Sequence, residues 1–378
     1  MKFINATKYI FSIILQNTIQ FLLFLFKQLF SFSPNSLNLF LGVIADQENT
    51  CITYHKRPQY SDDVSTTSYP WPNQKKLAII LQGPVIKEND FTIETIKIYI
   101  KHFPDDLIIL STWNDEDTVY LTKCPTKGVK IIFNKKPDYS GNQNINYQIA
   151  STYAGVIEAK ENNFEYILKT RTDQRLYSPD SKEFLFNILD NFPIDNGYNQ
   201  KSRIIGVSLN TFKFRPYGLS DMTLFGQIDD MIRYWGVKHD LRKPEDFLIS
   251  YMSCKSPKMR DFMRLKLCEI YLFTNFLESL GRDIKWTLAD SWDAFACHTC
   301  IIDKESLDLY WPKYQKFREF RYLEYSGATM KDELSFHDWL SLFSRKGNIE
   351  PVFEEIIEKT NVDTIDFDLL TSSSSRLY

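Results

Sequence analysis

Five short apolar runs, separated by segments with helical spacing, constrain the fold of this chain most strongly. They are "LAIIL" (77–81), "LIILSTW" (107–113), "VKIIF" (129–133), "FEYIL" (164–168) and "RIIGVSL" (203–209). Continuous apolar runs of this length indicate strands that are buried on both faces. Because these strands alternate with helical segments, the sequence predicts an α/β fold, with a mainly parallel sheet flanked by helices.

Polar residues follow three of these strands. They occupy positions 82–84, 111–114 and 169–175. In parallel sheets of this kind, ligands bind beyond the carboxyl ends of the strands. Side chains that are far apart in the sequence are therefore expected to meet in one crevice, which we take as the predicted site.

The segment "ILKTRTDQRLYS" (167–178) carries the densest charge of that crevice. Asp173 is a single acid among Lys169, Arg171 and Arg175. Alternating charge on a strand is often a solvated face with ordinary ion pairs. The alternative is a polyphosphate site, in which the bases hold phosphates and Asp173 holds a divalent cation that bridges them.

Three acids further along the chain are candidates for a general base. Asp221 precedes a predicted short strand, and Glu245 and Asp246 follow Pro244 at a predicted helix start. Acids in a first helical turn also fit simple complementarity with the helix dipole. The functional interpretation places one of them at the rim of the crevice, where it could accept a proton.

Charge and motifs exclude several function classes. Lysine and arginine number 45 against 48 aspartate and glutamate, so the net charge of −3 does not favour a nucleic-acid binder. The chain has no Gly-x-Gly-x-x-Gly after its first strand, no P-loop motif and no Gly-x-Ser-x-Gly. These absences argue against a dinucleotide enzyme, a P-loop nucleotidase and a serine hydrolase.

The six cysteines do not form a disulfide framework for a chain of 378 residues. "CHTC" (297–300) places two cysteines and one histidine within four residues, but a zinc site needs a second ligand pair at matching spacing. Reduced, buried thiols of a cytosolic protein are the favoured interpretation.

The N-terminus is apolar but interrupted by polar residues. Residues 9–26 read "YIFSIILQNTIQFLLFLF", and the polar positions recur at steps that place them on one stripe of a helix. Such a helix could lie on a membrane surface, or dock on its own domain or a partner. We expect this segment at 1–45, a linker at 46–75, the main domain with a helical C-terminal part at 76–345, and a tail at 346–378.

An ordered set of motifs resembles a known family. "IILQGPV", "IILSTW", "NINYQIASTYAG", "ILKTRTDQRLY" and "LSDMTLFG" occur in this order and are similar to the WavE-type lipopolysaccharide synthesis proteins. These are bacterial glycosyltransferases with a GT-A-like fold, and the resemblance covers roughly residues 75–345. The set is far more specific than any one of its members.

The resemblance implies a sugar transfer from a nucleotide-diphosphate donor to a lipopolysaccharide core or capsule-type glycan. The acceptor is a glycolipid or polysaccharide, and the protein is expected in the cytoplasm, peripheral at the inner membrane. Asp173 matches one acid of the Asp-x-Asp motif that holds a divalent metal, Mn or Mg. The family has an arginine where this chain has Tyr147. An inverting mechanism would use Asp221, Glu245 or Asp246 as the base. The residues expected at the donor are Gln82, Gly83, Pro84, Thr112, Trp113, Asn144, Asn146, Lys169, Arg171 and Arg175.

Two other classes stay open at this point. One is a sugar-phosphate or nucleotide transferase on a similar sheet. The other is a non-catalytic nucleotide-sugar-binding or assembly protein of cell-envelope polysaccharide synthesis. Detectable transfer of a sugar from a nucleotide sugar to a glycolipid would support a glycosyltransferase over both of these classes.

Overall fold

A computed structural model describes most of the chain. The described residues are 18, 20–22, 24, 41–47, 49, 51–52, 54–67, 73–242, 263, 266–312 and 333–349. The chain divides into two compact units, Met1–Arg57 and Pro58–Tyr378. In the smaller unit residues 41–47 are helical. Most of the predicted N-terminal helix lies outside the described residues; of its apolar side chains, Phe21, Leu22 and Phe24 are described, and all three are exposed. None of the described helices has the length and apolarity that a membrane span requires.

The larger unit is built on a seven-stranded sheet with the order β3-β2-β1-β4-β7-β6-β8. β1 pairs in parallel with β2 and β4, β2 with β3, and β6 with β8, whereas β7 runs antiparallel to both of its neighbours. The strands are β1 (Leu77–Gln82), β2 (Leu107–Trp113), β3 (Val129–Asn134), β4 (Tyr166–Arg171), β6 (Ile204–Val207), β7 (Leu224–Gln227) and β8 (Thr299–Ile302). The predicted mainly parallel sheet is thereby confirmed.

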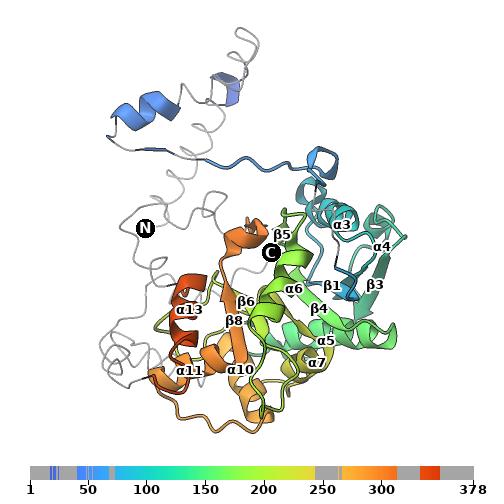
Figure 1. Cartoon of the computed structure of the whole chain (residues 1–378). Coiled ribbons are helices and arrows are strands. Elements are labelled where there is room, and N and C mark those ends of the chain that lie inside the picture. Colours follow the sequence, from blue (N-terminus) through green and yellow to red (C-terminus); the bar gives the residue numbers. More distant parts are fainter. Residues whose placement is uncertain are drawn as a thin grey trace, which may run out of the picture. The chain divides into compact units, whose positions relative to one another are not determined.

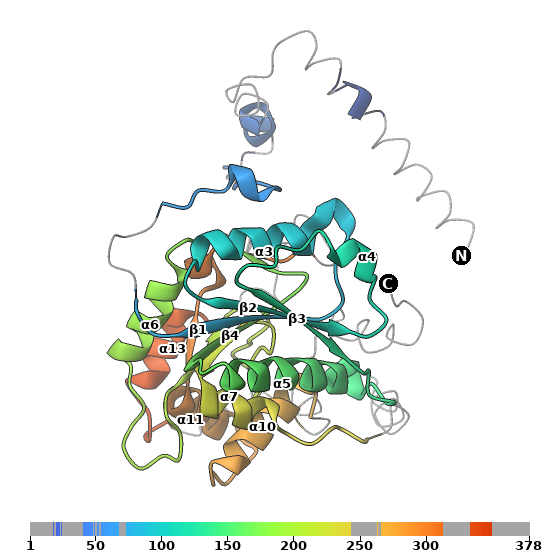
Figure 2. The same ribbon diagram turned by 90° about the vertical axis from the view of Figure 1, so that its right-hand side faces the viewer.

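Helices cover both faces of this sheet (Figures 1 and 2). α3 (Phe91–His102) lies on one face, and α5 (Ile145–Glu161) and α7 (Ile228–Trp235) lie on the other (Figure 2). Gly155 lets α5 approach the sheet closely, since a Cβ there would come within 2.8 Å of Ile80 Cγ2. Burial from both sides explains why β1 is apolar along nearly its whole length.

Helices dominate the C-terminal part of the larger unit. This part contains α10 (Cys268–Ser279), α11 (Leu288–His298) and α13 (Phe336–Phe343). Earlier in the chain, α6 (Ser181–Asn191) and the short α4 (Thr118–Leu121) are also helical. Trp339 of α13 is fully buried, and its indole meets the ring of Phe192 edge-on with centroids 5.1 Å apart. A two-stranded ribbon pairs β5 (Arg175–Leu176) with β9 (Leu309–Tyr310).

Part of the stretch predicted as a linker packs on α3. The Ser61 backbone N–H donates to Glu94 Oε2 at 2.7 Å, and Lys101 Nζ donates to the Ser61 carbonyl at 2.6 Å. Ser61 and Val64 are buried. The chain from Pro58 onward therefore belongs to the larger unit.

The sheet topology brings distant segments to one edge. Gln82 lies beside Ser111 and Arg171 in the register of the parallel strands. Because β7 is antiparallel to β4, its first residue, Leu224, lies opposite Lys169. The residues just before β7 therefore lie beside the carboxyl end of β4, in line with the carboxyl ends of β1 and β2 in the same sheet. We call this line of residues the carboxyl edge.

Candidate functional site

The turn after β1 is fixed against β4. Gly83 adopts φ 123°, and a Cβ there would come within 3.0 Å of Thr172 Oγ1. Thr172 Oγ1 donates to the Pro84 carbonyl at 2.6 Å, and the Thr172 backbone N–H donates to Gln82 O at 3.1 Å. The turn thus needs glycine, and it brings Gln82, Gly83 and Pro84 next to the segment that follows β4.

The end of β2 contributes Thr112 and Trp113 to the same edge. Both are buried, and Thr112 Oγ1 has no hydrogen-bond partner among the described residues. The Trp113 indole meets the ring of Tyr147 of α5 with centroids 5.4 Å apart. Tyr147 therefore supports the Trp113 side chain.

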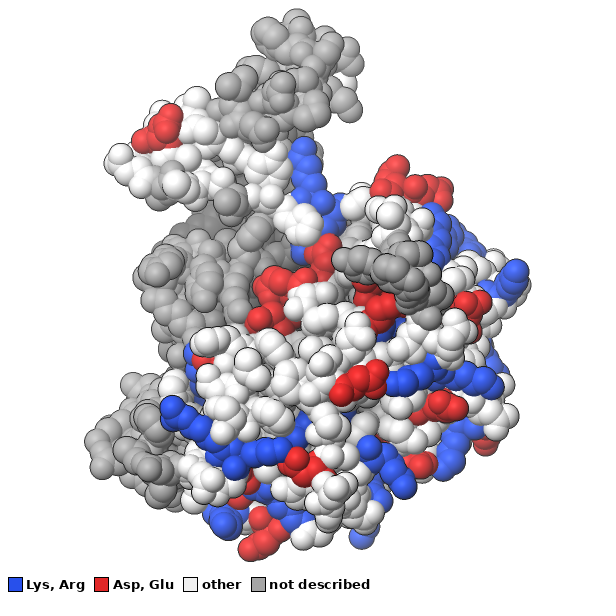
Figure 3. Space-filling view, viewed as in Figure 1, with Lys and Arg blue, Asp and Glu red and all other residues white. Residues whose placement is uncertain are grey.

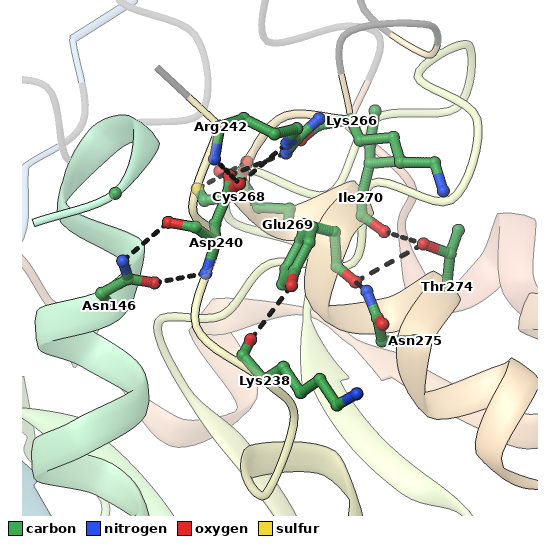
Figure 4. A network of polar contacts seen from close by, with 12 residues as sticks. Asn146, Lys238, Asp240, Arg242, Lys266, Cys268, Glu269, Ile270, Thr274 and Asn275 are labelled. Atoms are coloured by element: carbon green, nitrogen blue, oxygen red, sulfur yellow. Dashed lines mark hydrogen bonds and ion pairs between the residues drawn. The ribbon is translucent and has the colours of Figure 1, made fainter. Parts of the chain in front are cut away.

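The two asparagines at the start of α5 differ. Asn144 is exposed in a left-handed conformation with φ 62°. Asn146 is buried and clamps a loop: its Oδ1 accepts from the Asp240 backbone N–H at 2.6 Å, and its Nδ2 donates to Asp240 O at 2.8 Å (Figure 4). Its amide therefore has a structural role in place of the predicted donor contact.

Asp240 and Arg242 extend this clamp to the segment just before α10. Both of its carboxylate oxygens accept from the Arg242 guanidinium at 2.8 Å, and Arg242 Nη2 also donates to the Lys266 carbonyl at 2.8 Å (Figure 4). The chain on either side of the residues 243–265 is thereby joined at one point. Glu245 and Asp246, two of the predicted bases, lie outside the described residues.

Arg171 and Asp173 form a two-point ion pair at the end of β4. Arg171 Nε and Nη2 donate to Asp173 Oδ1 and Oδ2 at 2.7 and 2.9 Å. Trp311 Nε1 donates to Asp173 Oδ2 at 3.2 Å. The two charged side chains keep 19% and 15% of their surface exposed, so the pair lies at the carboxyl edge within reach of a ligand.

This pairing bears on the predicted metal. A divalent cation needs carboxylate oxygens as ligands, and both oxygens of Asp173 already accept N–H groups. Among the residues that the structure describes, no group of three or more histidine, cysteine or acidic side chains is placed to hold a metal. In this arrangement the residues around Asp173 do not fit a divalent ion.

Arg175 has turned away from the edge. It is 1% exposed, and its guanidinium donates to Thr95 Oγ1 at 3.0 Å, to Gln59 O at 2.8 Å and to Phe91 O at 2.9 Å. Its Cζ lies 4.4 Å from the centre of the Phe91 ring. In this arrangement Arg175 joins α3 to the chain around Gln59, and its guanidinium does not face the carboxyl edge.

The side chain of Lys169 also lies inside the protein. The residue is fully buried, and its Nζ donates to the carbonyl oxygens of Asp221 and Met222 and lies 5.0 Å from the centre of the Trp235 ring. Burial lowers the pKa of Lys169 from 10.5 to about 7, although the Asp221 carboxylate opposes this shift. Its ammonium faces protein groups in this arrangement, so it offers no phosphate contact.

Asp221 lies just before β7, next to Lys169. Its residue is 3% exposed, and Oδ2 has no hydrogen-bond partner among the described residues. Burying a carboxylate oxygen without a partner is costly, and such groups in folded proteins call for an explanation, of which a functional role is one. Of the three predicted bases, Asp221 is the one among the described residues, and it lies at the carboxyl edge.

Two further groups near Asp221 were not predicted. Tyr234 is fully buried without a hydroxyl partner among the described residues, and burial together with the Asp221 carboxylate raises its pKa. Glu269, at the start of α10, accepts from Asn210 Nδ2 at 2.7 Å, and burial raises its pKa, with Asp221 adding to the effect. Asn210 has a left-handed φ of 66°, a conformation that favours asparagine.

The "CHTC" cysteines are buried structural thiols. Cys297 lies in the last turn of α11 and Cys300 lies in β8, and both are buried. Burial raises the pKa of both thiols. His298 Nδ1 lies 2.8 Å from Gln200 Oε1, so this histidine contacts an amide.

Charge on the visible face of the larger unit is mixed. Lysine and arginine side chains alternate with aspartate and glutamate in Figure 3, without a broad field of one sign. This distribution agrees with the small net charge of −3 and offers no footprint for a nucleic acid.

Comparison with known proteins gives one match to a family. The sequence matches the family described as WavE lipopolysaccharide synthesis over residues 77–358. No curated protein matches it. The predicted family resemblance is therefore confirmed by an independent comparison.

Two solved structures show distant likeness. One is the mannose-1-phosphate geranyltransferase from Thermus thermophilus, at 13% identity and a TM-score of 0.25, covering 35% of this chain and 41% of the other. The second is a 4-diphosphocytidyl-2C-methyl-D-erythritol synthase, at 13% identity and a TM-score of 0.29, covering 44% of this chain and 82% of the other. The chain thus spans less than half the length of the first of these proteins.

Proposed function

Because this chain belongs to the WavE lipopolysaccharide synthesis family, we propose that it is a glycosyltransferase. It takes a sugar from a nucleotide-diphosphate donor and transfers it to a lipopolysaccharide core or capsule-type glycan. The observation that carries the proposal is the carboxyl edge, where β1, β2 and β4 end side by side in the sheet and Asp221 comes just before β7, the strand next to β4. Asp221 is a buried acid with an unpartnered carboxylate oxygen among the described residues.

Asp221 is the proposed base. In an inverting transfer the acceptor hydroxyl oxygen attacks the anomeric carbon, and the bond from that carbon to the diphosphate oxygen breaks. The hydroxyl proton passes to the carboxylate, and the nucleoside diphosphate leaves with the bonding electrons. Asp221 Oδ2 is buried and has no hydrogen-bond donor among the described residues, so an acceptor hydroxyl that reaches it meets an oxygen with no donor to displace.

Arg171 is the proposed contact for the departing diphosphate. It is the one base of the predicted cluster whose side chain stays partly exposed at the edge, at 19%, since Lys169 and Arg175 are buried. Asp173 holds the guanidinium at two points and thereby fixes its plane. An oriented guanidinium suits a phosphate better than a mobile one, because its donors match two phosphate oxygens.

A transfer assay tests the proposal. The full chain is incubated with each of several nucleotide-diphosphate sugars and with lipopolysaccharide cores that lack terminal sugars, and products are read by mass spectrometry. We expect one donor to add one hexose or related mass to the core and to release the nucleoside diphosphate. Saturable nucleotide-sugar binding without any transfer would instead favour an assembly protein.

A further inference from the structure

The side chain of Lys169 forms hydrogen bonds to the backbone at Asp221. Its Nζ donates to the Asp221 carbonyl and, at 3.4 Å, to the Met222 carbonyl. Its ammonium end is enclosed by the Trp235 indole of α7, 5.0 Å from the ring centre. A long side chain that is fully buried in this way holds its two acceptors at a fixed place relative to β4.

A second side chain, Gln174 in the turn after β4, contacts the next residues. Gln174 is fully buried, and its Oε1 accepts from Thr223 Oγ1 at 3.1 Å. Its Nε2 lies 3.7 Å from Met222 Sδ. Lys169 and Gln174 therefore clasp residues 221–223 from the end of β4 and the turn after it.

The clasp works in either charge state of the lysine. A neutral amine still has two N–H donors, enough for the two carbonyl oxygens. The titratable and charged groups that act on Lys169 are Arg171 of β4, Asp173 of the following turn, Asp221 before β7 and the Cys268 thiol of α10. Since the two carbonyls are uncharged, the contact with residues 221–222 does not require an ion pair.

We propose that Lys169 is a positioning residue, which fixes the backbone of Asp221 and Met222 so that the Asp221 carboxylate is presented to the acceptor hydroxyl. The inference rests on the proposed function, in which Asp221 is the base. Displacement of a catalytic group by about 1 Å can cost roughly 100-fold in rate. A residue that acts only on this placement should change turnover and leave donor affinity alone.

The test compares two buried lysines. Lys169→Met removes the clasp, and Lys182→Met removes a buried lysine that pairs with Asp106 at the other end of the sheet. We expect K169M to lower kcat by about 100-fold, with the donor Kd within about two-fold of the wild type, and K182M to keep kcat. Lys169→Arg, which retains donors for the two carbonyls, should recover at least part of the lost turnover.

Hydrogen exchange provides a readout that needs no activity. Amides of residues 221–223 should exchange faster in K169M, while those of β1 stay protected. Should K169M fail to fold, Lys169→Gln takes its place in both measurements, because it keeps a polar group but not the reach of lysine.

Two results would overturn the proposal. One is a weakened donor Kd with normal kcat, which would restore Lys169 as a phosphate contact. The other is unchanged exchange at residues 221–223 in a folded Lys169 variant, whatever the activity. If the wild type transfers no sugar, the proposed function fails, and the exchange measurement still decides whether Lys169 fixes this segment.

Discussion

Buried charged groups have different kinds of partner at the two ends of the sheet's strands, namely the carboxyl edge and the opposite end, which we call the amino edge. At the amino edge, Lys182 Nζ lies 2.9 and 2.8 Å from the two oxygens of Asp106, and Asp106 Oδ1 also accepts from the Leu77 backbone N–H at 3.2 Å. At the carboxyl edge, Lys169 donates to carbonyl oxygens, and Asp221 Oδ2 has no partner among the described residues.

The difference separates stability from function. Closed pairs such as Lys182–Asp106 satisfy their own hydrogen-bonding needs, so loss of one partner should harm folding alone. A buried carboxylate oxygen left unpaired weakens the fold, and proteins tend to retain such features at functional sites. The comparison therefore predicts that substitutions at the two edges give different phenotypes.

The largest expected effect is loss of turnover at Asp221. Asp221→Asn removes the base and should lower kcat by about 10²- to 10⁴-fold, the range for a general base. The free energy of unfolding should stay equal or rise, because an unpartnered buried charge is removed. Steady-state kinetics and urea unfolding of the same preparation measure both quantities.

A matched aspartate controls for burial. Asp230 of α7 is 2% exposed, and its carboxylate accepts from the backbone N–H groups of Lys201 and Ser202. Asp230→Asn should reduce stability and keep kcat. Equal loss of kcat in D221N and D230N would show that burial, and not the position of Asp221, explains the result.

At the amino edge the effect should fall on stability. Lys182→Met leaves Asp106 as a buried charge without its cation, which typically costs about 3–5 kcal/mol. Urea unfolding measures the loss, and kcat of the folded fraction should match the wild type. A folded K182M protein with reduced kcat would mean that the two edges are not separate in function.

Much of this contrast could not be read from the sequence. The apolar runs predicted the strands, because burial on both faces leaves a local pattern. The alternating charges of 169–175 did not indicate which partners these side chains have: Lys169 donates to the carbonyls of residues 221–222, and Arg175 donates to that of Gln59. These partners are far away in the chain. Only the antiparallel placement of β7 and the packing of the segment around Gln59 bring them near.

The sequence predicted the position of Asp221 beside the sheet but not the burial of Glu269 near it, for a related reason. Asp221 precedes a short strand that the sequence indicates, so its place at the sheet edge could be inferred. Glu269 opens a helix, where an acid ordinarily complements the dipole, and its approach to Asn210 depends on tertiary folding.

The pH dependence of stability offers a smaller effect that sharpens the comparison. Burial lowers the pKa of Lys169 to about 7, so between pH 7 and 10.5 the unfolded chain binds a proton that the folded chain does not. Stability from this group therefore rises with pH across that window, by at most about 1.4 kcal/mol per pH unit. K169M should lack this slope, whereas K182M should retain it, in unfolding experiments at several pH values.

The smallest expected effect is that of a chelator. Because Arg171 and Trp311 engage the Asp173 carboxylate, EDTA should change donor Kd and kcat by less than about two-fold, which is below about 0.4 kcal/mol. Isothermal titration with and without EDTA measures the donor affinity. A loss of binding that Mn²⁺ restores would mean that Asp173 exchanges Arg171 for a metal when the donor binds.

The most direct test of the account asks which edge binds the donor. Hydrogen exchange is followed in the wild-type chain with UDP, GDP, CDP or ADP, each compared with the protein alone. We predict that one nucleotide slows exchange in residues 82–83 and 171–173 and leaves residues 76–77 and 105–107 at the amino edge unchanged. Protection at the amino edge, or at neither edge with any of the four nucleotides, would contradict this prediction.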